Sequence, residues 1–530
     1  DARFVLQPVL NRRELGCDDV RRTVAHAFTW LDLHAGELYA SHVLAALLGR
    51  AELDAADVQR VTAHALTWLD LHTGLGDARF VLQPVLNRRE LGCDDVRRTV
   101  AHAFTWLERY PTLSEARFIF SALLSRTDLD REELRRTVAR TFAWLDHYST
   151  FKETCFVLQS VLNRTDLDRD DAQQAVVHAL TWLERHADES VASHVLQPLL
   201  NRGSRSRADT RRAVAHALTW LERHSAFNET RFVLQSVLNR TDLDRDDAQQ
   251  AVAHALTWLE RHADESVASH VLSGLLGRPD LGPDDVRQAV AHALTWLERH
   301  ADESVASHVL QPLLNRGSRS RADTRRAVAH ALTWLERYAA VPYATHVFSG
   351  LLGRPDLGPD DVRQAVVHAL TWLSHHATLV EARFVLAPLL KRPELAPEQA
   401  RQALSTALTW LNDHAAAPGA PLLLNPLLSH TSLTTEEAAS VLSAAFTWLT
   451  RHADGARARF VLAPLLTHAD LTPADTCRAV NYALTWLHAH GTAGKADLVL
   501  TALRSRPGLT PDAAARLRGY DNVGGDLEGR

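Results

Sequence analysis

The sequence has 530 residues, of which 46% are hydrophobic and 23% are charged, a composition typical of folded proteins and not of disordered ones. Its formal net charge of −6 gives no bulk positive field that would collect phosphates, and no apolar stretch is long enough to cross a membrane. The cysteines are far apart and lack metal-ligand spacing, so we expect free thiols in a reducing compartment, which favours the cytoplasm. They are Cys17, Cys93, Cys155 and Cys477.

All thirteen tryptophans lie on one series with a constant step of 38 residues, from Trp30 to Trp486. A fixed period of this length is typical of solenoids, in which each repeat packs only on its neighbours. The sequence therefore predicts an all-α fold, an α-solenoid superhelix of about thirteen two-helix repeats that forms one continuous domain over residues 1–506. Because Asp1 begins inside the repeat pattern, we expect a preceding segment to be missing, or self-association through an uncapped apolar face.

One repeat, residues 263–300, shows the internal layout. Apolar residues spaced three and four apart predict a first helix that ends near Gly277, and GRPDLGPD has the composition of a turn. Pro283 is suited to the first turn of a second helix, which we expect to end near His300. In later repeats Thr434 and Thr472 are the expected N-caps of this second helix.

The last part of the chain departs from this pattern. Residues 494–506 are expected to form a final first helix, and residues 507–530 a degenerate capping helix with a polar, disordered tail.

Several residues of the repeat are similar to those of the HEAT family of helical repeats. The resemblance rests on the opening of the second helix, on a small residue in its middle, on two leucines beyond it, and on a proline inside the first helix. These residues are Asp285, Val286, Arg287, Ala291, Leu294, Leu297, Pro198 and Pro312. The repeat resembles TPR units less closely, because their 34-residue period and Trp/Gly/Tyr pattern are missing. Both resemblances imply a helical solenoid and leave the ligand open.

The repeats differ from one another mainly along one stripe of the first helix, at three positions spaced i, i+4 and i+8. In most repeats arginine or serine occupies the first position, glutamine or serine the second, and asparagine or glycine the third; the exceptions include Cys155, Thr345, Ala45, Ala387, Ser125 and Lys391. The candidate ligand-binding residues of this stripe are Arg3, Gln7, Asn11, Arg79, Gln83, Asn87, Arg117, Ser121, Gln159, Asn163, Ser193, Gln197, Asn201, Arg231, Gln235, Asn239, Ser269, Ser273, Ser307, Gln311, Asn315 and Arg383. The residue after the first position alternates between phenylalanine and histidine.

Two interpretations of the stripe remain open. In the first, it faces a ligand, since amides and guanidinium groups supply hydrogen bonds and the small residues leave room. In the second, these are solvated positions, and the two residue sets are founder cassettes copied by recent duplication, as suggested by the recurrence of residues 187–222 at 301–336. Variation confined to one face, beside a nearly invariant second helix, favours recognition.

In most repeats a histidine lies four residues before the tryptophan, four residues after it, or at both positions. His292 and His300 flank Trp296 in this way. We expect these rings to pack against the neighbouring repeat while a ring nitrogen meets a carbonyl, and a pH-sensitive ladder is the alternative. Tryptophan is expected to be a packing residue, with base stacking as its alternative.

No catalytic motif and no metal-ligand spacing are recognisable, so we expect neither enzymatic activity nor a cofactor. The pattern favours a recognition scaffold for an elongated protein or peptide, and the shuffled cassettes resemble the repeat sensor arms of large bacterial signalling ATPases. The alternatives are a modular nucleic-acid reader with one repeat per base, which the net charge disfavours, and a self-associating structural rod. A membrane partner is not expected.

Overall fold

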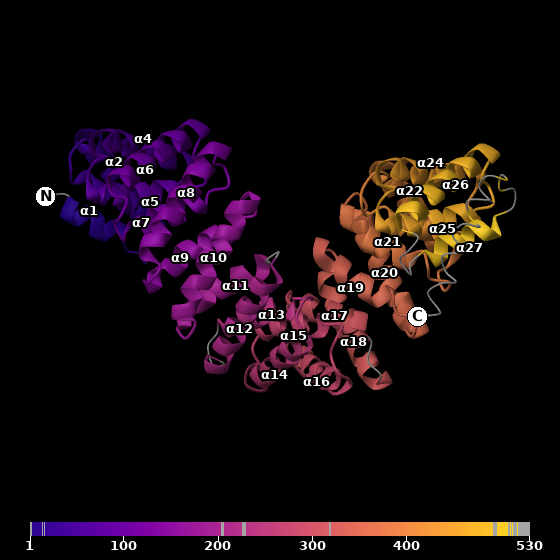
Figure 1. The fold of residues 1–530 in the computed structure, drawn as a ribbon. Coiled ribbons are helices and arrows are strands. Elements are labelled where there is room, and N and C mark those ends of the chain that lie inside the picture. The colour runs from indigo at the N-terminus through magenta and orange to yellow at the C-terminus, as the bar shows by residue number, and fades with distance from the viewer. Residues whose placement is uncertain are drawn as a thin grey trace. The chain divides into compact units, whose positions relative to one another are not determined.

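The computed structural model describes residues 3–12, 14, 16–202, 206–224, 229–316, 320–490 and 496–506, together with residues 509, 511 and 517. All regular structure within these residues is helical, and short helices alternate with long ones along the chain (Figure 1). The predicted all-α solenoid fold is thus confirmed. The capping helix and tail predicted for residues 507–530 lie outside the described residues, apart from the three isolated positions.

The short helices have odd numbers and are the first helices of the repeats. They are α1 (Arg3–Leu10), α3 (Ala40–Leu48), α5 (Arg79–Asn87), α7 (Ala116–Leu124), α9 (Cys155–Leu162), α11 (Ser193–Arg202), α13 (Thr230–Leu238), α15 (Ala268–Gly277), α17 (Ala306–Arg316), α19 (Thr345–Leu352), α21 (Arg383–Leu389), α23 (Pro421–Leu428), α25 (Arg459–Thr467) and α27 (Asp497–Ser505). Single-turn 3₁₀ helices precede some of them: η1 (Gly76–Ala78), η2 (Lys152–Thr154), η3 (Ser190–Ala192), η4 (Pro342–Ala344), η5 (Val380–Ala382) and η6 (Ala456–Ala458).

The long helices have even numbers and are the second helices. They are α2 (Cys17–His34), α4 (Ala55–His72), α6 (Cys93–Arg109), α8 (Arg131–Tyr148), α10 (Arg169–His186), α12 (Arg207–Arg223), α14 (Arg245–His262), α16 (Pro283–His300), α18 (Arg321–Tyr338), α20 (Pro359–His376), α22 (Pro397–His414), α24 (Thr435–His452) and α26 (Pro473–His490). The bounds of α15 and α16 agree with those predicted from residues 263–300.

Local chemistry explains where the second helices begin. Thr434 forms a capping box with Glu437 at the start of α24, and the Thr472 hydroxyl accepts a hydrogen bond from the backbone N–H of Asp475 at 3.1 Å. Pro283 opens α16, where its missing N–H would have no helical partner. Each cap satisfies backbone donors that the first turn leaves open, so the turn between the two helices stays short.

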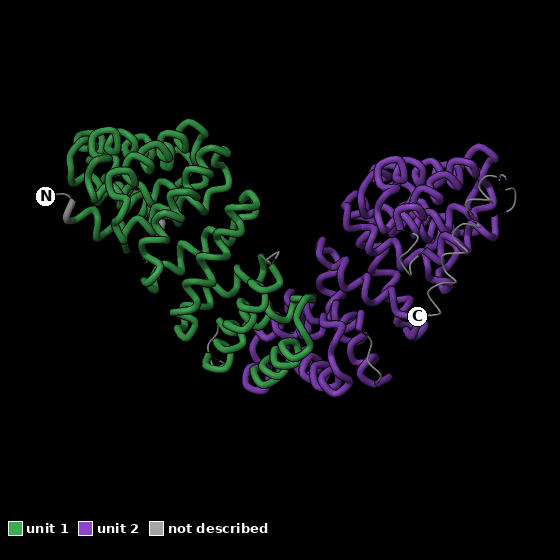
Figure 2. The backbone as a smooth tube through the Cα atoms, in the orientation of Figure 1, with its two compact units in different colours: residues 1–258 green, residues 259–530 purple. Residues whose placement is uncertain are grey.

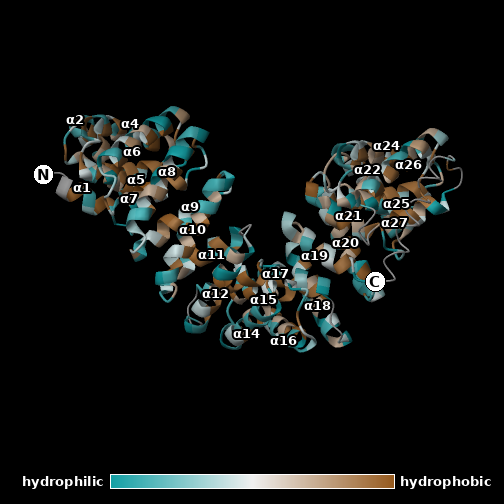
Figure 3. Cartoon of the chain, viewed as in Figure 1, coloured by the Kyte–Doolittle hydropathy of each residue, from teal (hydrophilic) through white to brown (hydrophobic). Residues whose placement is uncertain are grey.

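The core lies between the layer of first helices and the layer of second helices, and Figure 3 shows the hydropathy of each residue along both. Valine and leucine pairs of the first helices are fully buried against alanine, leucine and tryptophan of the second helices. Ten tryptophans have less than 2% of their surface exposed. Burial of side chains this large stabilises each repeat by about 1.5–3 kcal/mol per residue, so the tryptophan series forms the centre of the core.

The chain divides into two compact units, residues 1–258 (unit 1) and residues 259–530 (unit 2), and the boundary falls inside α14 (Figure 2). In each unit the neighbouring first helices approach one another more closely than the neighbouring second helices do. A stack that is tighter on one side curves toward that side, so the first helices lie on the inner side of the curve within each unit. Among the described residues, no helix has the length and apolar content needed to pass through a lipid bilayer.

Candidate functional site

A row of exposed and half-buried side chains runs along the first helices at the residue that follows the first stripe position. We call it the ring row, because most of its members carry a ring. In unit 1 it consists of His42, Phe80, Phe118, Phe156, His194 and Phe232, and in unit 2 of His270, His308, His346, Phe384, Leu422, Phe460 and Leu498. Phe80 is 47% exposed and Phe156 45% exposed, which is unusual for phenylalanine in a folded protein.

Helix geometry places the ring row beside two of the three stripe positions. The second stripe position follows the ring by three residues and the third follows it by seven, so all three side chains share one helix face. In α5 this face carries Phe80 and Asn87, which are exposed, and Gln83, which is half-buried. The valines and leucines between them point into the core. The helix therefore presents one ring and two amides in a line.

The first stripe position does not belong to this face. Ser193, Ser269 and Ser307 are only 5%, 1% and 6% exposed, and the hydroxyls of Ser193 and Ser307 donate to carbonyl oxygens three residues earlier at 3.0 Å. Packing of neighbouring first helices buries this position. The expectation that these three serines contact a ligand is therefore corrected, and they are removed from the candidate set.

Arginine at the first stripe position lies against the ring that follows it. The Arg79 guanidinium lies 4.4 Å from the centre of the Phe80 ring and donates to the Gly76 carbonyl at 3.3 Å. The pairs of Arg117, Arg231 and Arg383 with their phenylalanines have spacings of 4.3–4.5 Å. This cation–π contact explains why arginine accompanies phenylalanine, while serine or threonine accompanies histidine. The side chain of Arg3 lies outside the described residues.

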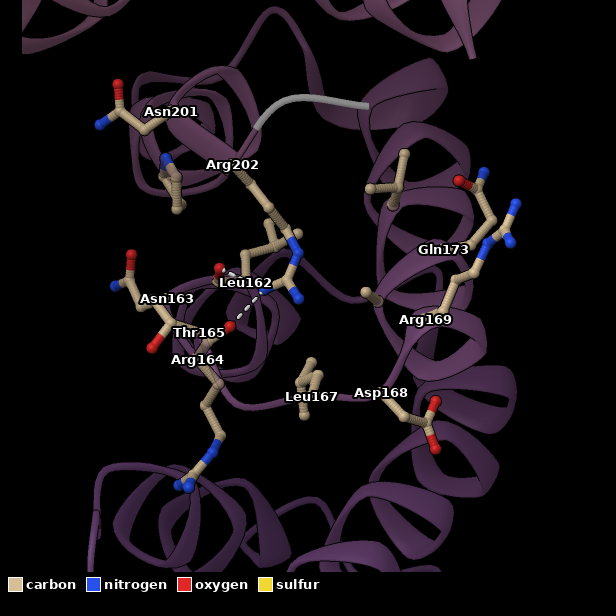
Figure 4. A pocket seen from close by; sticks show the side chains of 13 residues that line it. Leu162, Asn163, Arg164, Thr165, Leu167, Asp168, Arg169, Gln173, Asn201 and Arg202 are labelled. Carbon is tan, nitrogen blue, oxygen red and sulfur yellow. Dashed lines mark hydrogen bonds between the residues drawn. The ribbon is translucent and has the colours of Figure 1, made fainter. Parts of the chain in front are cut away.

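The amides of the stripe are free for a partner. Within the described residues, the side chains of Gln7, Gln83, Gln159, Gln197, Gln235 and Gln311 make no hydrogen bond and are half-buried. The same holds for Asn11, Asn87, Asn163, Asn201, Asn239 and Asn315, which are exposed. Figure 4 shows Asn163 and Asn201 extending away from the ends of α9 and α11. Each amide can both donate and accept, so every such repeat offers two unused hydrogen-bonding groups.

Two hollows lie on this face and are lined by equivalent positions of the repeat. One, of about 400 Å³ in unit 1, is lined by Gln83, Asn87, Phe118 and Phe156 among others, and Glu153 is at its edge. The other, of about 560 Å³ in unit 2, is lined by residues of α19 and α21 and by Leu422 of α23. Both open between three consecutive first helices. Ser121 lines the first hollow, and Ser273 is half-buried at the same stripe position.

The charge of this face differs from that of the whole chain. Helices α1 to α25 of the odd-numbered layer contain no aspartate or glutamate, while most second helices begin with one or two carboxylates. The negative net charge is therefore carried by the second helices and the loops. The ring row lies on a neutral to basic layer.

A second feature is a ladder of buried and half-buried arginines at or just after the ends of the first helices, which the sequence analysis missed. Arg164, 6% exposed, donates to the carbonyls of Leu124 and Arg126 in the preceding repeat at 2.8 and 2.5 Å. It also pairs with Asp166 at 2.6 Å, and this hydrogen bond holds the pKa of Asp166 below its usual value. Equivalent bonds to carbonyls 40 residues earlier are made by Arg50, Arg88, Arg126, Arg202, Arg240, Arg316, Arg354, Arg392 and Arg506.

Figure 4 shows one step of this arginine ladder, in which Arg202 reaches the carbonyls of Leu162 and Arg164. The guanidinium lies at the negative end of the preceding first helix and satisfies carbonyls that the helix leaves open. It borders a hollow of about 550 Å³ that is also lined by Asp168 and Arg169 at the start of α10. The sequence signal was available: arginine directly follows the third stripe position in nearly every repeat, and an acidic residue often follows two positions later.

Tryptophan has the predicted packing role. The nitrogen of the histidine that follows it meets a carbonyl as predicted, but the ring packs on the tryptophan of its own helix, where we expected the neighbouring repeat. The Trp220 indole donates to the Glu189 carbonyl at 2.9 Å, and tryptophans from Trp68 to Trp182 and from Trp296 to Trp486 make the same bond at 2.8–3.1 Å. The His224 ring packs on Trp220 at 4.8 Å and meets the Asp188 carbonyl at 2.9 Å. Burial makes the tryptophans from Trp68 to Trp486 inaccessible to a stacking base, whereas Trp30 is half-buried.

Sequence and structure comparisons give the following result. No protein-family model and no curated protein matches the sequence, so the resemblance to HEAT and TPR repeats stays a prediction. The solved Puf3 RNA binding domain bound to a Cox17 RNA recognition sequence is 13% identical with a TM-score of 0.32, and the match covers 63% of this chain and 98% of that one. Human Puf-A in complex with DNA is 12% identical with a TM-score of 0.32, and the match covers 95% and 98%. At these values the similarity says nothing about what this chain binds.

Proposed function

We propose that this chain is a non-catalytic scaffold that binds an extended single-stranded nucleic acid along the ring row, with one base per repeat. The observation that carries the proposal is a line of rings along the first helices, joined on the same helix face by two unpartnered amides in α5, α9, α11, α13 and α17. A ligand that matches this surface must itself repeat a flat unit with a hydrogen-bonding edge. Unpaired bases have both properties.

The ring row offers stacking surfaces in a continuous line. Neighbouring ring centres are 5.4 Å apart for Phe156 and His194 and 6.4 Å apart for His270 and His308. A base inserted between two rings needs about 7 Å between their centres, because stacked flat groups are about 3.4 Å apart. Bases would therefore stack on the open faces of these rings and not between them.

Electrostatics supports it as well. Helices α1 to α25 of the first-helix layer contain no carboxylates, so the net charge of −6 overstates the repulsion at this layer, although Glu153 lines the hollow in unit 1. Guanidinium groups beside the phenylalanines, such as those of Arg79 and Arg117, add positive charge next to the ring row. A polyanion can therefore approach this layer more readily than the net charge suggests.

A peptide is the second candidate, and one observation favours it. In unit 2 the ring row contains Leu422 and Leu498, which are 45% and 55% exposed and carry no ring. An aliphatic side chain offers an apolar contact but no stacking platform, and apolar contacts of this kind are common in protein–protein interfaces.

Binding of a fluorescently labelled single-stranded oligonucleotide, followed by anisotropy, tests the proposal. Each substitution Phe80→Ala, Phe118→Ala or Phe156→Ala should weaken binding by about 1–3 kcal/mol, the usual value for one base–aromatic stack. The matched controls are Leu71→Ala and Val177→Ala, which remove exposed apolar side chains (64% and 50%) from second helices and should leave affinity unchanged.

Salt separates the two ligand classes. Nucleic-acid binding should weaken steeply as ionic strength rises, because each neutralised phosphate releases counterions. Absence of oligonucleotide binding at low salt, or equal losses in the ring variants and the controls, would refute the proposal. Salt-insensitive capture of an extended peptide that depends on the ring row would establish the second candidate in its place.

A further inference from the structure

Three consecutive repeats carry the complete set of ligand-facing groups. Helices α9, α11 and α13 each present a ring, a glutamine and an asparagine on the face described above: Phe156, Gln159 and Asn163; His194, Gln197 and Asn201; Phe232, Gln235 and Asn239. Among the described first helices this is the one run of neighbours that does so. The other complete sets whose side chains are all described, in α5 and α17, stand alone.

The three helices lie side by side in unit 1, in the order α9, α11, α13 (Figure 1). The Phe156 and His194 rings are 5.4 Å apart, and the six amides of the group have no hydrogen-bond partner within the described residues. The group is therefore a grid of three rings and six free amides on helices without carboxylates, and Glu153 and Glu229 lie just before α9 and α13.

The repeats on either side lack the amides. The preceding helix, α7, has Ser121 and Ser125, and the Ser125 hydroxyl is already bonded to the Ser121 carbonyl at 2.7 Å. The next repeat along the chain has Ser273 and Gly277 in α15. Their ring-row members, Phe118 and His270, remain. These flanking repeats can hold a flat group by stacking but have no amide with which to distinguish it.

We infer that α9, α11 and α13 form a selective core that recognises three successive bases of a single strand by their edges, while the flanking repeats hold bases regardless of identity. This inference rests on the proposed function. Selectivity follows from the chemistry: stacking accepts every base, because each has a flat face, whereas an amide must match donors and acceptors on the base edge. Discrimination at each of the three positions should be about 5- to 150-fold, the range for one well-formed bidentate contact.

The chain provides a matched pair for the test. Residues 187–222 recur at 301–336, so Gln197 in α11 and Gln311 in α17 have the same local sequence but different neighbours. Gln197 lies in the middle of the core, whereas the neighbours of Gln311 carry serine and glycine. Substitution of either half-buried glutamine by alanine removes an amide that makes no internal hydrogen bond, so both variants should fold.

The experiment selects bound strands from a pool of random single-stranded oligonucleotides with the full chain and with the Gln197→Ala and Gln311→Ala variants. For the unsubstituted chain we expect three adjacent constrained positions among the bound strands. Gln197→Ala should release the middle one, and Gln311→Ala should leave all three unchanged.

The outcomes separate this inference from the proposed function. Three outcomes would overturn the selective core and leave nucleic-acid binding intact. The retained strands could show no constrained position, they could show constraint spread evenly over all repeats, or the two variants could have equal effects. If the unsubstituted chain retained no oligonucleotide from the pool, the proposed function would be overturned, and the selective core with it.

Discussion

The arginine ladder leads to a prediction about how the repeats are held together. Replacing Arg164 by methionine keeps an apolar stem of similar length and removes the two bonds to the Leu124 and Arg126 carbonyls at 2.8 and 2.5 Å. It also leaves Asp166 without its partner. Asp166 is 51% exposed and can be solvated, so the main cost comes from the carbonyls left without a donor, about 1–3 kcal/mol. We expect Arg164→Met to destabilise the interface between α7 and α9 by that amount.

Because a solenoid's stability is a sum over repeats and their interfaces, the loss should be local. Hydrogen–deuterium exchange read by mass spectrometry should show faster exchange in α7, α9 and the turns after them, with distant repeats unchanged. Arg164→Lys, which keeps the charge but not the planar fork, should be intermediate. The control is Arg185→Met in α10, an exposed arginine whose loss should change stability by less than about 0.5 kcal/mol. Equal protection in the Arg164→Met and Arg185→Met variants would refute the reasoning.

Three further predictions concern the core. Trp220→Ala should cost about 3–5 kcal/mol in urea denaturation, because it leaves a cavity and frees the Glu189 carbonyl, and a loss below about 1 kcal/mol would contradict the packing role. Burial lowers the pKa of histidines four residues before the tryptophans, so their neutral form is favoured in the fold; stability should be complete above their unfolded pKa of about 6.5 and fall as the pH drops below it. Melting temperatures between pH 5 and 8 would show this, and a chain equally stable at pH 5 and 7.5 would contradict it. These histidines are His102, His178, His216, His254, His292 and His330. Burial also raises the pKa of Cys155 to about 12, so in the native protein a thiol reagent should label the exposed Cys93 and Cys477 and spare Cys155, as peptide mapping would reveal.

The repeat could be predicted from the sequence because its signals are local. Tryptophan spacing gave the period, apolar spacing gave both helices, and Pro283 and Thr434 marked the starts of second helices at the positions where the structure has them. The hydrogen bond made by the ring after a tryptophan, such as that of His224 with a carbonyl of the same hairpin, was also predictable, since a half-apolar ring beside tryptophan needs a partner for its nitrogen.

The exact ligand-facing set could not be predicted, because it depends on how neighbouring helices pack. Serine at the first stripe position looks solvent-exposed in a sequence, yet Ser269 is 1% exposed because the adjacent first helix covers it. Phe80 looks like a core residue, yet it is 47% exposed because the stack leaves its side of the helix open. The arginine ladder was missed for the same reason, since the carbonyls that Arg164 binds lie in another repeat, 38 and 40 residues earlier.

The central claim is that a single strand lies along the ring row on the first helices. Ultraviolet crosslinking of a bound oligonucleotide, with the attached residues identified by mass spectrometry, tests it most directly. Crosslinks should fall on Phe80, Phe118 and Phe156 and on their counterparts in neighbouring repeats, at one site per repeat. A strand that binds but crosslinks only to second helices would contradict the claim.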